Sequence, residues 1–213
     1  MKKLLIAAAA SIVACAAHAG GFYVGGQLGT MSVKNWTQDS ANRLVALGGG
    51  ASSSSQDTGV GASRLFAGYN FNNIVGLELG YLNSGEVKGN LSGKDRTGAG
   101  YDGSFTIRTS GFDLSAIVHP FEGSHNGTTP PSGLYLRAGI SNYTTRIDAT
   151  NTAASSVQWF SSSKTGNGTL VGLGYDLKLG PGALRFDLTA HQSMADLTNN
   201  DSTALSVGYL YQF

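Results

Sequence analysis

Hydrophobic and polar residues alternate along eight separate segments of the chain, which is the periodicity of β-strands with one apolar face. In the third segment, for example, Val75, Leu77 and Leu79 share one face, whereas Glu78 lies on the opposite face. The segments are 22–31, 64–70, 74–82, 112–119, 134–143, 169–179, 183–193 and 205–213. We therefore predict an all-β fold in which eight strands follow one another as an antiparallel, up-and-down meander.

The faces opposite the apolar ones carry charged residues, and this decides which face points outward. A soluble barrel or sandwich, the alternative fold, has its apolar face in the core. The core of a soluble protein would not hold as many charges as the opposite faces carry here. A membrane barrel turns its apolar face to lipid and has a polar interior, and closure leaves no unpaired strand edge. We predict a transmembrane β-barrel with aromatic girdles at the membrane interfaces, formed by Tyr69, Phe71, Tyr81, Tyr175, Phe186, Tyr209, Tyr211 and Phe213.

The connections between the segments alternate in length, which is a second signal for such a barrel. Asn72-Asn73 and Gly180-Pro181-Gly182 are tight turns, although the middle turn at 122–132 is longer. The remaining connections are long, polar and rich in Gly and Ser; they are 32–60, 83–104, 144–164 and 194–201. Outer-membrane barrels have short periplasmic turns and long extracellular loops, so we expect these four segments outside the cell.

The N-terminal residues are typical of a secretory signal peptide. Lys2 and Lys3 precede an apolar run over 4–17, which is shorter than the ~20 residues that a membrane-spanning helix needs. Ala17-His18-Ala19 supplies the small residues of a cleavage site. We therefore predict a signal peptide at 1–19 and one barrel domain at 20–213. A lipoprotein reading, with Cys15 as the lipidated residue, is the alternative.

Composition and charge exclude some classes of function. The chain has 14 basic and 13 acidic residues, and loss of Lys2 and Lys3 with the signal leaves 12 basic ones. Nucleic-acid binding needs a basic footprint, so no nucleic-acid partner is expected. The one cysteine, Cys15, also leaves with the signal, so disulfide and thiol chemistry are not expected in the mature protein.

The inward faces predict a polar network in the barrel interior. They carry four basic and four acidic residues, namely Arg64, Glu78, Asp113, Arg137, Asp176, Lys178, Arg185 and Asp187. The interior of an eight-stranded barrel is about as wide as the side chains that fill it, and charges buried there must be paired. We therefore favour a self-neutralising plug over a narrow or gated pore. The inward residues Leu82, Ile117 and Leu210 also favour filling.

Several strands resemble the transmembrane domain of the outer-membrane protein A family. The resemblance rests on Phe66-Ala67-Gly68-Tyr69 followed by 75–81, on 21–29, on Leu184-Arg185-Phe186-Asp187 and on 205–213, where the terminal Phe213 resembles the assembly signal of such barrels. This implies an eight-stranded barrel in the outer membrane, inserted by the barrel assembly machinery. Without a peptidoglycan-binding domain in this sequence, the plan is more similar to short opacity-type and surface-adhesin barrels.

Two positions depart from that family's pattern. The family's interior lysine on the fourth strand falls at Ile117, and its interior glutamate on the sixth strand falls at Gly174. The interior ion-pair switch of the family therefore does not carry over as a whole, and only Glu78 and Arg185 match it.

Motifs for chemistry are sparse. His191-Gln192-Ser193 is similar to the His-x-Ser arrangement of outer-membrane lipid A deacylases, but Met194 replaces the family's asparagine and no third, orienting group is evident. The glycine-rich stretch 98–103 neither follows a strand nor opens a helix, so it does not predict a dinucleotide site. His119 and His125 have too few neighbouring ligand residues to predict a metal site. We expect no catalytic residues, no cofactor and no metal.

The long loops are the remaining place for a function, with Trp36, Trp159 and Phe160 as candidate contact residues. We therefore expect a monomeric, non-enzymatic outer-membrane barrel with a structural or surface-interaction, adhesin-like role. Its expected partners are outer-membrane lipid and lipopolysaccharide, and a host or surface ligand at the loops. A narrow porin-like channel is the alternative, and a lipid A-modifying hydrolase ranks third.

Overall fold

The computed structural model describes residues 21–33, 50–94, 98–121, 133–153, 156–193 and 201–213. The predicted signal peptide at 1–19, with Cys15, lies outside the described residues, as do Trp36, His125 and the middle turn. None of the described residues belongs to a helix long and apolar enough to cross a membrane.

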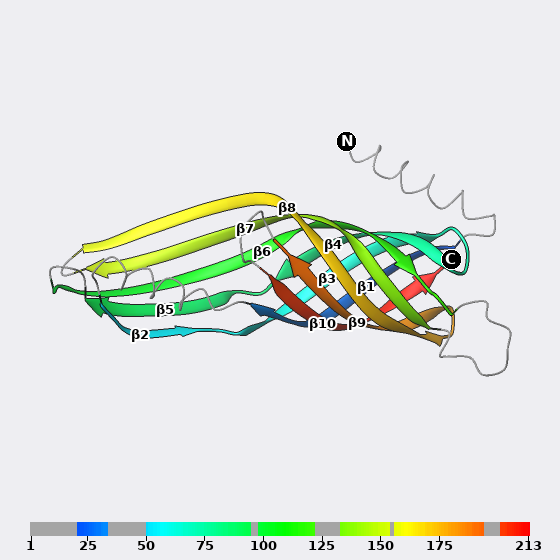
Figure 1. The fold of residues 1–213 in the computed structure, drawn as a ribbon, viewed down its shortest axis with the longest axis horizontal. Coiled ribbons are helices and arrows are strands. Elements are labelled where there is room, and N and C mark those ends of the chain that lie inside the picture. Colours follow the sequence, from blue (N-terminus) through cyan, green and yellow to red (C-terminus); the bar gives the residue numbers. More distant parts are fainter. Residues whose placement is uncertain (1–20, 34–49, 95–97, 122–132, 154–155, 194–200) are drawn as a thin grey trace.

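Ten strands make up the described fold, and eight of them close into a barrel (Figure 1). The barrel strands are β1 (Phe22–Val33), β3 (Gly59–Asn70), β4 (Val75–Ser84), β6 (Gly100–Val118), β7 (Leu134–Ala153), β8 (Ser156–Leu179), β9 (Gly182–Gln192) and β10 (Ser202–Gln212). Each pairs antiparallel with the next, and β10 pairs with β1 to close the sheet. This confirms the predicted eight-stranded antiparallel β-barrel.

Two further strands lie in segments that the sequence indicated as loops. They are β2 (Gly50–Gln56) and β5 (Val87–Lys94), and β2 pairs with β5, which pairs with the first half of β6. The β6–β7 and β7–β8 ladders also continue to Ala153, far into the predicted 144–164 loop. The long connections predicted at 32–60, 83–104 and 144–164 therefore contain paired strands, which the sequence did not indicate. A sheet of β2, β5 and the outer halves of β6, β7 and β8 projects from one end of the barrel (Figure 1), and we call it the extension.

The opposite end of the barrel carries the two short turns, and we call it the turn end. At the first turn, the Asn72 side-chain oxygen accepts hydrogen bonds from the backbone N–H groups of Ile74 and Val75, both at 2.8 Å. At the second, Gly180 has a φ of 61°, a conformation that favours glycine. Local chemistry thus accounts for both predicted turns.

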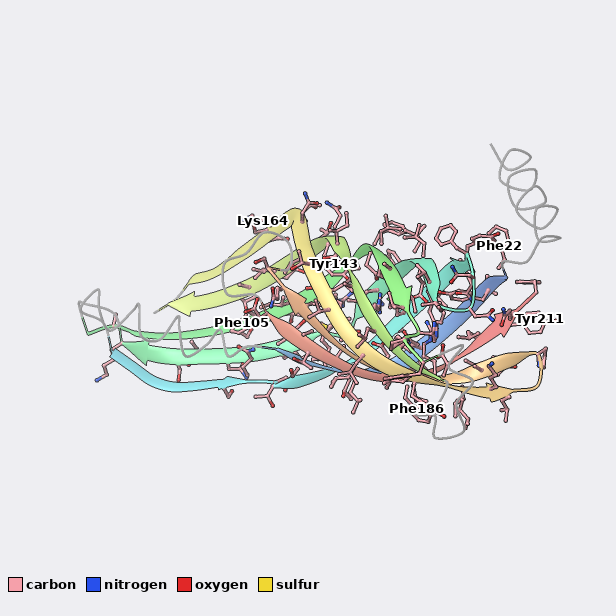
Figure 2. All side chains as sticks on the ribbon, turned by 45° about the vertical axis from the view of Figure 1, so that its right-hand side comes forward. Phe22, Phe105, Tyr143, Lys164, Phe186 and Tyr211 are labelled. Atoms are coloured by element: carbon pink, nitrogen blue, oxygen red, sulfur yellow. The ribbon has the colours of Figure 1, made fainter. Side chains whose placement is uncertain are left out.

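The outward faces of the barrel strands are apolar, as the alternation predicted. Leu28 is 69% exposed, for example, whereas its neighbour Gln27 on the inward face is buried. Aromatic pairs lie near both rims: Phe22 and Tyr69 are 4.7 Å apart between ring centroids at the turn end, and Tyr81 and Phe112 are 4.9 Å apart toward the extension. Figure 2 shows Phe22 and Tyr211 together at the turn end. An exposed apolar belt between aromatic rims is the surface that a lipid bilayer covers.

Candidate functional site: the barrel interior

The interior of the barrel is occupied by a connected set of charged side chains. Seven of the eight predicted interior residues belong to it, and we call them the interior ion network: Arg64, Glu78, Asp113, Arg137, Asp176, Arg185 and Asp187. They come from six strands, and the closure of the sheet brings them together. The network is therefore a property of the whole barrel rather than of one hairpin.

Glu78 on β4 joins the two sides of this network. Its Oε1 accepts a hydrogen bond from Arg64 Nη1 at 2.7 Å, and its Oε2 accepts one from Arg185 Nη1 at 2.6 Å. The Tyr23 hydroxyl donates to the same Oε2 at 3.1 Å. The side chain is 0% exposed, so its charge is balanced entirely by these neighbours.

Asp113 on β6 pairs with two arginines. Arg64 donates to both of its oxygens, from Nε at 3.0 Å and from Nη2 at 2.7 Å, and Arg137 Nη2 donates to Oδ1 at 2.5 Å. Arg137 also donates from Nε to the Ser115 hydroxyl at 3.0 Å. A bidentate arginine–carboxylate pair is among the strongest and most precisely oriented polar contacts in proteins.

The remaining carboxylates complete the pairing on β8 and β9. Asp176 accepts two hydrogen bonds from Arg185, each at 2.7 Å. Asp187 accepts hydrogen bonds from the Tyr135 hydroxyl at 2.5 Å and from Thr189, and Arg137 lies 3.9 Å away. The Arg185 guanidinium also lies over the Tyr135 ring, 4.6 Å from its centroid.

The eighth predicted residue, Lys178, has a different environment. It is exposed at the turn end, where it lines an open hollow of about 430 Å³ together with His119, Asp176 and Gln212. The His119 Nε2 lies 3.5 Å from an Asp176 oxygen. Lys178 therefore lies at the mouth of the barrel, because it is close to the end of β8, where the interior opens to water.

Apolar side chains pack on both sides of the network, and the open hollow at the turn end reaches Asp176 and Arg185. Toward the extension, Met31, Val60, Leu82, Val87, Ile107, Tyr143 and Ala204 form one buried cluster. Toward the turn end, Tyr23, Phe66, Ala183 and Leu210 form another. Between them, a cavity of about 20 Å³ remains beside Gln27 and His191, which is about the room that one water needs. Within the described part of the chain, only Gln27 Nε2 and Ser141 Oγ are buried side-chain polar atoms without a hydrogen-bond partner.

The two departures from the resembled family have a packing explanation. Ile117 is fully buried and pairs across the sheet with Arg137. At position 174, a Cβ would meet the backbone oxygen of Phe186 and the ring of Tyr135. The Tyr135 side chain thus fills the space that an interior glutamate at this position would need. The alternation over 134–143 predicts that Tyr135 points inward, but it does not predict that this side chain fills the space beside Gly174.

The structure separates the two residues of the His-x-Ser string. His191 is 3% exposed inside the barrel, where its Nδ1 lies 3.5 Å from the Tyr143 hydroxyl. Ser193 follows the end of β9, is exposed and has a φ of 53°, and its N–H donates to Asp201 at 3.2 Å. The alternation over 183–193 predicts that Ser193 points inward together with His191; this is wrong, because β9 and its alternation end at Gln192. Among the described residues, no group of three or more His, Cys, Asp or Glu side chains could hold a metal ion.

Residues 4–213 match the Outer membrane protein beta-barrel domain family, which is nearly the whole chain. A comparison with curated protein sequences gave no match. Among solved structures, the attachment invasion locus protein Ail of Yersinia pestis, in complex with the heparin analogue sucrose octasulfate, is similar at 14% identity and a TM-score of 0.51, over 92% of this chain and 100% of Ail.

Two other solved structures are similar over most of their length. Neisserial surface protein A is 15% identical over 92% of this chain and 100% of its own, with a TM-score of 0.42. The outer membrane protein OprG of Pseudomonas aeruginosa is 14% identical over 92% of this chain and 96% of its own, with a TM-score of 0.43. With the closed barrel, its exposed apolar belt and the match to the domain family, the chain belongs to the outer membrane protein β-barrel domain family and is a protein of the outer membrane.

Proposed function

We propose that this protein is a non-enzymatic, adhesin-like surface protein and that the extension is its binding surface. The observation that carries the proposal is the length of the barrel strands: β6, β7 and β8 have 19, 20 and 24 residues. A transmembrane strand needs only about 9–11 residues. About half of each strand thus extends beyond the membrane, on the side opposite the short turns that face the periplasm.

The edges of the extension are suited to bind an extended segment of another protein. Among the described residues, β2 pairs only with β5, and residues 156–168 of β8 pair only with β7. An unpaired edge presents a row of backbone donors and acceptors to which a partner strand can add. The β2 sequence, Gly-Ala-Ser-Ser-Ser-Ser-Gln, carries no charged residue that would oppose such pairing.

The filled interior favours a surface role over a channel. A conducting path would have to pass both apolar clusters and the interior ion network. A ligand-binding role has a parallel in Ail, which was crystallised with a heparin analogue. That parallel shares the fold alone with this chain, so the proposal rests on the extension.

Shortening the β7–β8 hairpin tests the proposal. Ile147 and Ser162 are direct cross-strand partners, so residues 148–161 can be replaced by Asn-Gly, which forms a two-residue hairpin turn. We expect the variant to fold as a barrel and to lose most of the adherence that the full chain gives to cells expressing it, measured on immobilised extracellular-matrix proteins.

A matched control keeps the hairpin and changes only side chains, with Ser163→Thr and Thr165→Ser. Because edge pairing uses the backbone, this control should adhere like the unchanged protein. Adherence that survives the shortening, or that the full chain does not give at all, would contradict the proposal.

A further inference from the structure

The outer face of β6 and β7 changes stepwise from apolar to basic between the membrane belt and the extension. Four direct cross-strand pairs follow one another on this face: Leu114 with Ile140, Phe112 with Asn142, Ser110 with Thr144, and Arg108 with Arg146. Going outward, the face therefore offers alkyl groups, an aromatic ring with an amide, two hydroxyls and two guanidiniums. The distance from Phe112 to Arg108 is about 13 Å along the strand, at ~3.3 Å per residue.

The lower part of this face is hollowed. A groove of about 540 Å³ is lined by the apolar residues Leu79, Phe112, Leu114 and Ile140 and, at its upper end, by the amides Asn142 and Asn167. Asn142 Nδ2 donates to Asn167 Oδ1 at 2.8 Å, and above it the hydroxyls of Thr144 and Thr165 are 2.8 Å apart. Apolar space below exposed amides and hydroxyls fits a molecule with an alkyl chain and a polar, sugar-like head.

The upper part of the face places two like charges side by side. Arg108 and Arg146 are direct partners on neighbouring strands, an arrangement that is unfavourable without nearby anions. Glu86 contacts Arg108 and lies 3.6 Å from Lys88, and Asp148 lies 3.2 Å from Arg146. Three cations thus share two carboxylates. The Arg108 and Arg146 side chains are 62% and 63% exposed, so these ion pairs are weak and can exchange for a stronger anion.

We propose that this face binds one lipopolysaccharide molecule of the outer leaflet through its lipid A. An acyl chain lies in the groove, the amide and hydroxyl side chains contact the acylated disaccharide, and the paired arginines bind a phosphate. The order of the groups along the face is the order of the groups in lipid A. The face also begins in the apolar belt and lies beside the extension, which places it in the outer leaflet. Paired guanidiniums match the oxygens of a phosphate better than single charges do.

The test measures binding of purified lipid A to the refolded full chain in detergent micelles, by native mass spectrometry or calorimetry. Bisphosphorylated lipid A should bind at least about tenfold more tightly than dephosphorylated lipid A and than phosphatidylglycerol, and the difference should shrink at high salt. The double substitution Arg108→Ala/Arg146→Ala should weaken binding of the bisphosphorylated form about tenfold to thirtyfold, since each basic residue near an anionic lipid surface contributes roughly fivefold.

A second double substitution, Lys94→Ala/Lys164→Ala, is the matched control. It removes the same amount of positive charge, but from exposed positions outside the four cross-strand pairs of the proposed site. It should therefore change binding less than about threefold. Heat-modifiable migration on a gel verifies that both variants fold. Equal losses in the two variants would mean diffuse attraction and would overturn the proposal. So would unchanged binding in Arg108→Ala/Arg146→Ala, or an unchanged chain that binds dephosphorylated lipid A and phosphatidylglycerol as tightly as bisphosphorylated lipid A.

Discussion

Replacing Glu78 by alanine is expected to lower the free energy of unfolding by about 3–5 kcal/mol, the cost of removing one partner of a buried ion pair. The substitution takes the shared acceptor away from Arg64 and Arg185 and from the Tyr23 hydroxyl, and all three groups are buried. Urea-induced unfolding of the protein in lipid vesicles, followed by circular dichroism, measures the change. Few single substitutions in this chain should have a larger effect.

Two comparisons isolate the role of burial. Glu78→Gln keeps the shape and some hydrogen bonds and should be less destabilising than the alanine variant. Glu86 also pairs with an arginine and a lysine, but its side chain is 33% exposed and both partners are more than 60% exposed, so Glu86→Ala should change the stability by less than about 1 kcal/mol. A Glu78→Ala protein as stable as Glu86→Ala would mean that the interior ion network does not hold the barrel together.

The second large effect is expected on the outside of the barrel. Leu173 is 50% exposed and lies between two other outward leucines, Leu136 and Leu188, as their direct strand partner. Leu173→Arg should lower the free energy of unfolding in vesicles by about 2–4 kcal/mol, because an arginine near the middle of the bilayer loses its hydration. The same urea titration measures it.

A matched control lies on the same face of the same strand. Ser161 belongs to the extension, is exposed and is the direct cross-strand partner of Asp148, so an arginine there meets an opposite charge and Ser161→Arg should change the stability by less than about 1 kcal/mol. If both arginines had equally small effects in vesicles, the leucine belt would not be in contact with lipid. A soluble barrel would show that result, since an exposed leucine in water tolerates arginine.

The barrel strands could be predicted because lipid selects every second residue in them. On β4, Leu77, Leu79 and Tyr81 point to the belt, while Glu78 and Gly80 point inward. This two-residue period indicated both the strands and their orientation. It also identified the charged interior residues, since a charge on a lipid-facing position would be strongly destabilising.

The extension could not be predicted in the same way. Its β2 strand and the outer half of β8 do not alternate as the lipid-facing strands do and consist largely of Ser, Thr, Gly and Asn. Such a composition is typical of loops, and the strand ladder is visible only in the paired backbone.

The sequence also did not predict which charged residues of the interior ion network pair with one another. Arg64 pairs with both Glu78 and Asp113, and Arg185 reaches Glu78 from β9, far away in the chain. Which inward charges meet depends on strand tilt and on the register of the closed barrel. The sequence indicated balanced charges on inward faces, and the closed sheet determines how they combine.

Conductance across a planar bilayer tests the central claim, that this barrel is filled and works through its outer surface. We expect the refolded protein, with its folded state verified by heat-modifiable migration, to give no discrete channel openings, because the interior ion network lies between two apolar clusters. Repeated openings of uniform size, altered in Glu78→Ala, would contradict the account and would make the interior a gated pore.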